Sequence, residues 1–253
     1  MTAPRRAHGF SAKTRRLWPA VLAALSAAPA AADGLPPGWV RLSEAAPGIA
    51  QDIRYARGFN FTGAPVPGYG APECLLRHEA AEALARVQAA LEPQGLALIV
   101  WDCYRPARAS AHFAAWAEGG GPDPGAFFFP GLSRADLIAQ GYVARRSSHS
   151  SGGTVDLGLV RPGDPVLRPD TADAPCDAPF PDRPAETGLD LGTAFDCFSP
   201  LSAVAAEVPQ EARRNRRLLA RAMEAQGFLP YAAEWWHFRL PLPDAEPRDF
   251  PVE

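Results

Sequence analysis

The chain has 253 residues, of which 47% are hydrophobic and 21% are charged, enough apolar content for the core of one moderately sized domain. Its formal net charge of -3 becomes -8 without the first 32 residues, which hold five cationic side chains and no acidic one. This acidic balance argues against nucleic acid or an anionic membrane surface as a partner. The single lysine, Lys13, lies in the same segment, which excludes lysine Schiff-base chemistry in the remainder.

Residues 1–32 have the pattern of a secretory signal peptide, with a basic start, an apolar stretch and small residues before a cleavage point. The apolar stretch, residues 17–32, contains two prolines and is shorter than the roughly 20 residues of a membrane-spanning helix, so a membrane anchor is the weaker alternative. We expect cleavage before Asp33, export to the bacterial periplasm and no stable membrane anchor afterwards. Arg15 and Arg16 leave both the general and the twin-arginine export routes open.

A helix followed by a buried strand is expected early in the mature chain. Apolar residues recur at three- and four-residue steps over residues 75–91, which predicts an amphipathic helix. Residues 93–95, Pro-Gln-Gly, end this helix, and the apolar run over residues 96–102 then predicts a strand. Each element is about 24 Å long, so a strand that doubles back along the helix returns to the helix start.

Four cysteines in an exported chain indicate disulfide bonds. The doubling back of the strand brings Cys103 near Cys74, and Cys176 and Cys197 bracket a proline-rich loop. We therefore predict the pairs Cys74–Cys103 and Cys176–Cys197, although the sequence alone leaves other pairings open. No C-x-x-C spacing is present, which argues against a cysteine zinc site.

The later elements point to an α+β fold in a single domain, residues 33–253. Helices and strands are intermixed without a regular βαβ rhythm, which favours a small sheet flanked by helices. Residues 161–189 form a long loop rich in proline and aspartate. The remaining expected elements are helices over 106–118, 134–140 (with Ser133 as N-cap) and 209–226, and strands over 155–160 and 233–240.

Of the four histidines in the mature chain, two lie in unusual surroundings. His78 and His112 lie in predicted helices and are expected to be ordinary surface or interface residues. His149 lies in a turn of small residues, and His237 lies in an aromatic-rich strand. The last two are therefore the candidates for chemistry.

A metal site is one interpretation of these two histidines. Asp156 follows His149 by seven residues, and the two glycines between them allow the chain to bend so that both side chains converge. Glu234 precedes His237 by three residues, and in a strand this spacing needs a bulge or bend, which Trp235 and Trp236 can anchor in the core. The spacing alone leaves open the alternative that these are polar loop groups and a cap on an aromatic core.

Several blocks resemble the VanX-type D-alanyl-D-alanine dipeptidases. SSHSSGGTVDLGLV and EWWHF resemble the two metal-binding motifs of that family. DIRYARGFNFTGAPVPGY, IVWDCYRPARA, LGTAFDCF and RRNRRLLARAMEAQGF resemble further family segments, in the family order, over most of residues 45–242. The resemblance implies an α+β fold of the hedgehog/D,D-peptidase type, with a small, mainly antiparallel sheet and a zinc site at the sheet.

The resemblance also implies roles for individual residues. The ligands of one zinc ion per chain would be His149, Asp156 and His237, with an open position for water. Glu234 would be the general base and acid, and the guanidinium of Arg105 would stabilise the tetrahedral intermediate.

Three further residues carry expected roles in substrate binding, and two positions depart from the family pattern. Ser147 is expected to contact the substrate, Asp196 to help bind its amino group, and Tyr55 to line the pocket, although a packed core tyrosine is an equal alternative. Ser151 stands where the family usually has arginine, and Thr154 stands where it usually has alanine. Loss of that cation is expected to alter the support of the site or the substrate preference.

The activity that the resemblance implies is zinc-dependent hydrolysis of the dipeptide D-Ala-D-Ala, derived from peptidoglycan, to two D-alanines. One alternative is a D,D- or L,D-carboxypeptidase that acts on peptidoglycan stem peptides. Another is a zinc-stabilised binding module without catalysis, such as the hedgehog domains. Retention of both Glu234 and Arg105 favours an enzyme, because neither is needed merely to hold zinc.

Overall fold

A five-stranded sheet forms the centre of the fold in the computed structural model, which describes residues 1–2, 34–123, 127–184 and 186–253. All but two residues of the predicted signal peptide therefore lie outside the described residues. Residues Leu35–Glu253 form one compact unit with helices beside the sheet, which confirms the predicted α+β fold. Among the described residues, no helix has the length and hydropathy needed to cross a membrane.

The strands of the central sheet follow the order β2-β4-β5-β7-β6 and are mostly antiparallel. Only β2 and β4 pair in parallel. Every residue of β4 and β5 is buried, so these two apolar runs, predicted as strands, form the middle of the core. The strand bounds are β2 (Ala50–Gln51), β4 (Ala97–Asp102), β5 (Thr154–Val160), β6 (Leu229–Tyr231) and β7 (Glu234–Arg239).

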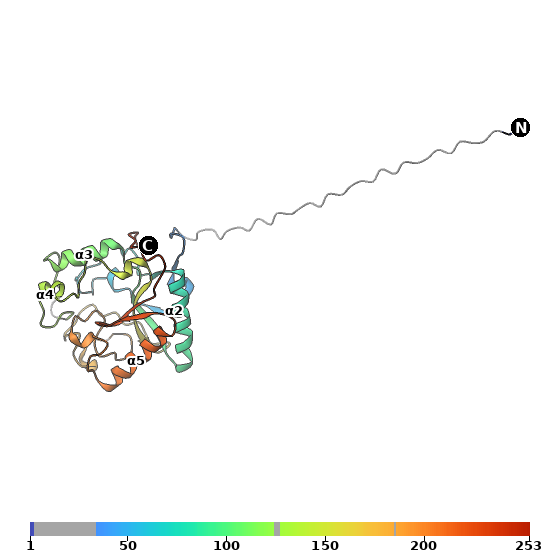
Figure 1. Cartoon of the computed structure of the whole chain (residues 1–253). Coiled ribbons are helices and arrows are strands. Elements are labelled where there is room, and N and C mark those ends of the chain that lie inside the picture. Colours follow the sequence, from blue (N-terminus) through green and yellow to red (C-terminus); the bar gives the residue numbers. More distant parts are fainter. Residues whose placement is uncertain (3–33, 124–126, 185) are drawn as a thin grey trace. The chain divides into compact units, whose positions relative to one another are not determined.

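The helices lie on two sides of the sheet (Figure 1). α2 (His78–Leu91) and α5 (Gln210–Glu224) contact each other and pack against β4 and β5. α3 (Ala107–Ala117) and α4 (Arg134–Ala139) contact each other on the other side, where Phe113 of α3 lines the cavity described below. The predicted helices over these segments are confirmed, and Ser133 caps α4 through a capping box with Asp136. Short helical turns complete the fold: α1 (Leu42–Ala45), Arg54–Ala56, Glu92–Gln94, Ser148–Ser151, Phe180–Asp182 and Pro200–Ser202.

The start of the first predicted helix was wrong by three residues. Residues 75–77 form strand β3 (Leu75–Arg77), which pairs antiparallel with β1 (Trp39–Arg41) in a separate two-stranded sheet. The backbone of Arg77 is still extended, and the helix begins at His78. Leu75 and Leu76 are both apolar and both buried. The apolar periodicity therefore could not distinguish the first turn of a helix from a short strand.

The cysteine sulfurs lie at bonding distance in the two predicted pairs. Cys74 and Cys103 have Cα atoms 5.3 Å apart, because β4 runs back along α2 as expected. Cys176 and Cys197 have Cα atoms 5.4 Å apart and connect the proline-rich loop to the segment before Phe198. In its described part, this loop contains only the helical turn Phe180–Asp182.

Candidate metal centre and catalytic cavity

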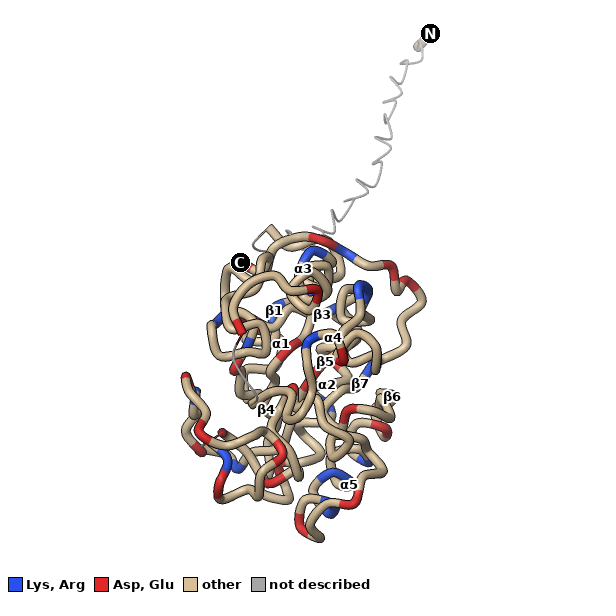
Figure 2. The backbone as a smooth tube through the Cα atoms, turned by 90° about the vertical axis from the view of Figure 1, so that its left-hand side faces the viewer, with Lys and Arg blue, Asp and Glu red and all other residues tan. Residues whose placement is uncertain are grey.

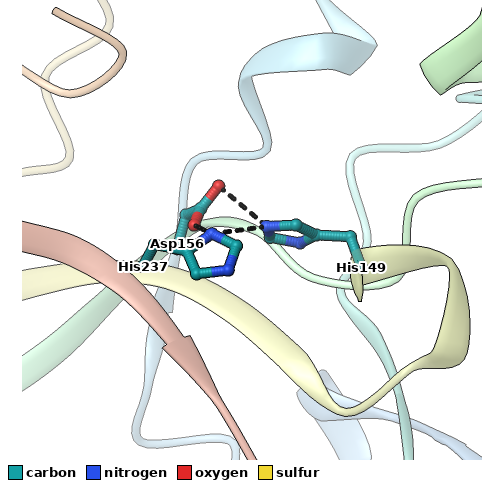
Figure 3. A group of neighbouring side chains, drawn as sticks. All are labelled: His149, Asp156 and His237. Carbon is teal, nitrogen blue, oxygen red and sulfur yellow. Dashed lines mark hydrogen bonds and ion pairs between the residues drawn. The ribbon is translucent and has the colours of Figure 1, made fainter. Parts of the chain in front are cut away.

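Three side chains converge at the centre of the sheet (Figure 3). His149 Nε2 lies 3.2 Å from His237 Nδ1 and 3.2 Å from Asp156 Oδ2, and His237 Nδ1 lies 3.1 Å from Asp156 Oδ1. Asp156 on β5 stands directly opposite His237 on β7, so the sheet register brings this pair together. His149 approaches from the helical turn Ser148–Ser151.

Two glycines allow the chain to bend between His149 and Asp156. Gly152 has φ +77°, a left-handed conformation that favours glycine, and a Cβ there would lie 2.3 Å from the ring of Trp39. A Cβ at Gly153 would lie 2.9 Å from the carbonyl oxygen of Leu240. The bend that the sequence predicts is present, and no larger side chain fits at either position without a rearrangement.

The donor set fits a zinc ion. Tetrahedral zinc with bonds of about 2.0 Å has ligand atoms about 3.3 Å apart, close to the separations between the three side chains. His149 Nδ1 lies 2.7 Å from the carbonyl oxygen of Cys103 and can donate to it, which leaves Nε2 free to bind a metal. Asp156 Oδ1 is buried and makes no hydrogen bond of its own, although His237 Nδ1 lies 3.1 Å away. Among the described residues, His149, Asp156 and His237 are the one such cluster of possible metal ligands.

Asp156 is ionised in this setting. Burial works to raise the pKa of its carboxyl, but the adjacent imidazoles of His149 and His237 outweigh burial and hold that pKa below the usual range. A charged carboxylate between two imidazoles is the form that a divalent cation requires.

Glu234 lies beside the three converging side chains. Its Oε2 lies 3.6 Å from His237 Nδ1, because the pairing of β7 with β6 is irregular after Glu234. Trp235 and Trp236, which occupy this irregularity, are buried, as the sequence predicts for a bend anchored in the core. Burial raises the pKa of Glu234 to about 7, the nearby charge of Asp156 also raises it, and His237 and Arg105 oppose the rise.

Arg105 is held at the cavity wall by Asp102. Its Nε and a terminal nitrogen lie 2.9 and 2.7 Å from Asp102 Oδ2, and the same nitrogen lies 3.7 Å from Asp156 Oδ2. Burial alone would lower the pKa of Arg105, but the charges of Asp102 and its neighbours raise it, so the guanidinium remains charged. Tyr69 also donates to Asp102 Oδ1 at 2.6 Å.

Asp102 and Tyr69 are site-supporting residues that the sequence interpretation missed. The segment IVWDCYRPARA contains Asp102, but the family resemblance assigned a role only to its Arg105. An aspartate at the end of an apolar strand, three residues before that arginine, was the available signal. Tyr69 had no comparable signal, because it meets Asp102 only in the folded chain.

Asp196 and Tyr55 form a second polar pair in the same cavity. The Tyr55 hydroxyl donates to Asp196 Oδ2 at 2.8 Å, and Asp196 adopts a left-handed backbone with φ 59°. Burial, together with the negative charge of Asp156, raises the pKa of Asp196 well above its usual range. Ser147 Oγ lies 3.5 Å from a terminal nitrogen of Arg105. Tyr55 is thus both a packed core residue and part of the cavity wall.

All eight predicted site residues line one cavity of about 430 Å³: Tyr55, Arg105, Ser147, His149, Asp156, Asp196, Glu234 and His237. The other two histidines lie elsewhere. His78 is exposed at the start of α2, with its ring 3.4 Å from Glu82, and His112 lies on α3 outside the cavity lining.

Ser151 is the serine that stands where the family usually has arginine. Its hydroxyl donates to the carbonyl oxygen of Ser148 at 2.7 Å and stabilises the turn that carries His149.

The chain matches known peptidases over most of its length. Residues 37–167 and 184–251 match the family described as D-ala-D-ala dipeptidase, and the omitted segment lies within the proline-rich loop. The D-alanyl-D-alanine dipeptidase of Streptomyces coelicolor is 37% identical over 220 residues, covering 83% of this chain and 96% of the relative. The D-alanyl-D-alanine dipeptidase of Enterococcus faecium is 34% identical, covering 85% of this chain and 98% of the relative. That of Escherichia coli is 31% identical, covering 77% of this chain and 80% of the relative.

Proposed function

The chain belongs to the D-ala-D-ala dipeptidase family, and from that premise we propose that it hydrolyses the dipeptide D-Ala-D-Ala to two D-alanines with one zinc ion per chain. The observation that carries the proposal is the convergence of two histidines and an aspartate beside a glutamate and a paired arginine in one cavity. The ligands would be His149, Asp156 and His237. A bound zinc ion supplies a Lewis acid that polarises the scissile carbonyl and acidifies water.

The roles of Glu234 and Arg105 follow from their places beside the ligands. The Glu234 carboxylate takes a proton from the attacking water and later delivers it to the leaving amine. Arg105 donates to the oxygen on which negative charge develops, and its ion pair with Asp102 keeps the guanidinium aimed into the cavity. Neither group is needed to hold the metal, so their presence favours catalysis over a purely structural site.

The polar pair of Asp196 and Tyr55 is proposed to hold the amino end of the substrate. A buried carboxylate is costly without a cation, and the dipeptide ammonium supplies that cation. The Tyr55 hydroxyl keeps the carboxylate in place. Ser147, within reach of Arg105, is proposed to donate to the substrate backbone.

Hydrolysis of D-Ala-D-Ala by the purified mature chain tests the activity. We expect release of D-alanine, loss of this activity after chelation and recovery on addition of zinc. A peptidoglycan stem peptide ending in D-Ala-D-Ala is the matched comparison. Faster cleavage of the stem peptide would favour the carboxypeptidase alternative, and absence of turnover in zinc-loaded protein would favour the non-catalytic module.

We further propose that the chain is exported to the periplasm and that both cysteine pairs are oxidised there. The support is the signal-like pattern of residues 1–32 and the bonding distance of the sulfurs in both pairs. Mass spectrometry of the protein recovered from the periplasm is expected to show an N-terminus at Asp33 and no free thiol. A retained N-terminal segment or four reactive thiols would contradict the proposal.

A further inference from the structure

Two arginine side chains at the rim of the catalytic cavity have no partner among the described residues. Arg146 and Arg239 both line the cavity, and within that part of the chain neither guanidinium makes a hydrogen bond or an ion pair, although the backbone of Arg239 pairs within the sheet. Arg105, deeper in the same cavity, is instead neutralised by Asp102. Acidic and basic residues are interspersed over the elements seen in Figure 2.

The sheet register places Arg239 one step beyond the metal centre. His237 stands opposite Asp156 and Arg239 stands opposite Thr154, so Arg239 is on the same face of β7 as His237 and about 7 Å further along the strand. Glu234 lies on the other side of His237 along the strand. The cavity therefore extends from the metal centre towards Arg239, away from the proposed base.

The segment that carries His149 lies next to His237. Ser148 Oγ lies 3.4 Å from His237 Nε2, and Arg146, two residues before Ser148, also lines the cavity. The two arginines therefore reach the cavity from the two segments that meet at His237, Arg239 from β7 and Arg146 from the chain before His149.

Two exposed apolar side chains of β6 line the cavity. Leu229 pairs with Arg239 across β6 and β7, whereas Tyr231 pairs with Glu234 and its ring lies 5.5 Å from the His237 ring, centre to centre, so the two side chains flank His237. Leu229 and Tyr231 are each 49% exposed, which is unusual for large apolar side chains. Apolar walls with a few convergent polar groups are typical of a ligand subsite.

We propose that Arg146, Arg239, Leu229 and Tyr231 form a subsite for an acidic side chain on the second residue of the dipeptide. The methylene groups of that side chain contact Leu229 and Tyr231, and its carboxylate accepts hydrogen bonds from the two guanidinium groups. Asp156 and Glu234 lie beside His237, whereas Arg239 lies two residues beyond it along β7, so we place the anion at the Arg239 end of the cavity. The inference rests on the proposed dipeptidase activity and extends its substrate class to D-aminoacyl dipeptides with a C-terminal glutamate.

A pair of isosteric substrates tests the subsite. D-Ala-D-Glu and D-Ala-D-Gln differ in one charged group, and we expect kcat/KM to favour D-Ala-D-Glu by about fivefold at low salt. Because exposed charges are screened, this ratio should fall towards one as salt is added. A ratio of one or below in the wild type would overturn the subsite, whatever the rate with D-Ala-D-Ala. Absence of D-Ala-D-Ala hydrolysis would instead overturn the proposed function, so the two failures are distinguishable.

Two variants and a matched control locate the effect. Arg239→Gln and Arg146→Gln should each lower the ratio of the two kcat/KM values, and the double variant should bring it close to one. Arg161→Gln removes the same charge from an exposed position outside the cavity and should leave the ratio unchanged. A ratio that survives the double variant, or falls equally in Arg161→Gln, would show that no subsite exists at these residues. All the altered side chains are exposed, and unfolding temperatures check that each variant is folded.

Discussion

Replacement of Glu234 by glutamine is expected to lower kcat for D-Ala-D-Ala by about 10²–10⁴-fold while zinc remains bound. Glutamine has nearly the same shape as glutamate but cannot accept and return a proton. Glu234 lies 3.6 Å from a ligand atom without being one of the three converging ligands, so the metal should be retained. Steady-state kinetics and zinc content per chain are the two measurements.

The matched control for this variant is Glu224→Gln, which changes an exposed glutamate near the end of α5. We expect wild-type kcat and zinc content in the control. If Glu234→Gln kept kcat within tenfold of the wild type with full zinc content, another group would have to be the base. If it lost zinc, Glu234 would be supporting the metal rather than transferring the proton.

Replacement of Asp156 by asparagine is expected to weaken zinc binding by more than about 100-fold and to abolish turnover at limiting zinc. Even groups that only support metal ligands change affinity by about 10–100-fold, and Asp156 supplies the sole carboxylate among the three converging donors. Its carboxylate is charged between His149 and His237, whereas an amide is neutral and a weaker ligand. Competition with a zinc-binding dye measures the affinity directly.

A thermal readout separates lost metal binding from lost folding. Zinc that binds only the folded chain stabilises it by about 2.7 kcal/mol at a free concentration 100 times the dissociation constant. The wild type and the control Asp173→Asn, which changes an exposed loop residue, should both show a zinc-dependent rise in unfolding temperature. Asp156→Asn should be folded in chelator yet show no such rise at the same zinc concentration. A rise equal to that of the wild type would remove Asp156 from the ligand set.

The elements that the sequence predicted well are those with a strong local signal. The periodicity of α2 and α5, the capped start of α4 and the apolar runs of β4 and β5 are each encoded within one segment. The residues of the candidate metal centre were indicated by the family resemblance of their two short motifs, because spacing alone left open that they were polar loop groups and a cap on an aromatic core. The same local reasoning was wrong for β3, since its conformation depends on pairing with β1, about 35 residues earlier in the chain.

By itself, then, the sequence determined the fold class, and its family resemblance indicated the residues that meet at the candidate metal centre. Only the tertiary structure decided what surrounds them. The Asp102 carboxylate that holds Arg105, the Tyr69 hydroxyl that donates to Asp102, and the position of the Arg239 side chain at the cavity rim all depend on sheet register and on contacts between distant segments. The alternation of residues along a strand predicts which side chains share a face of the sheet. The partner strand and its register decide which neighbouring side chains they contact.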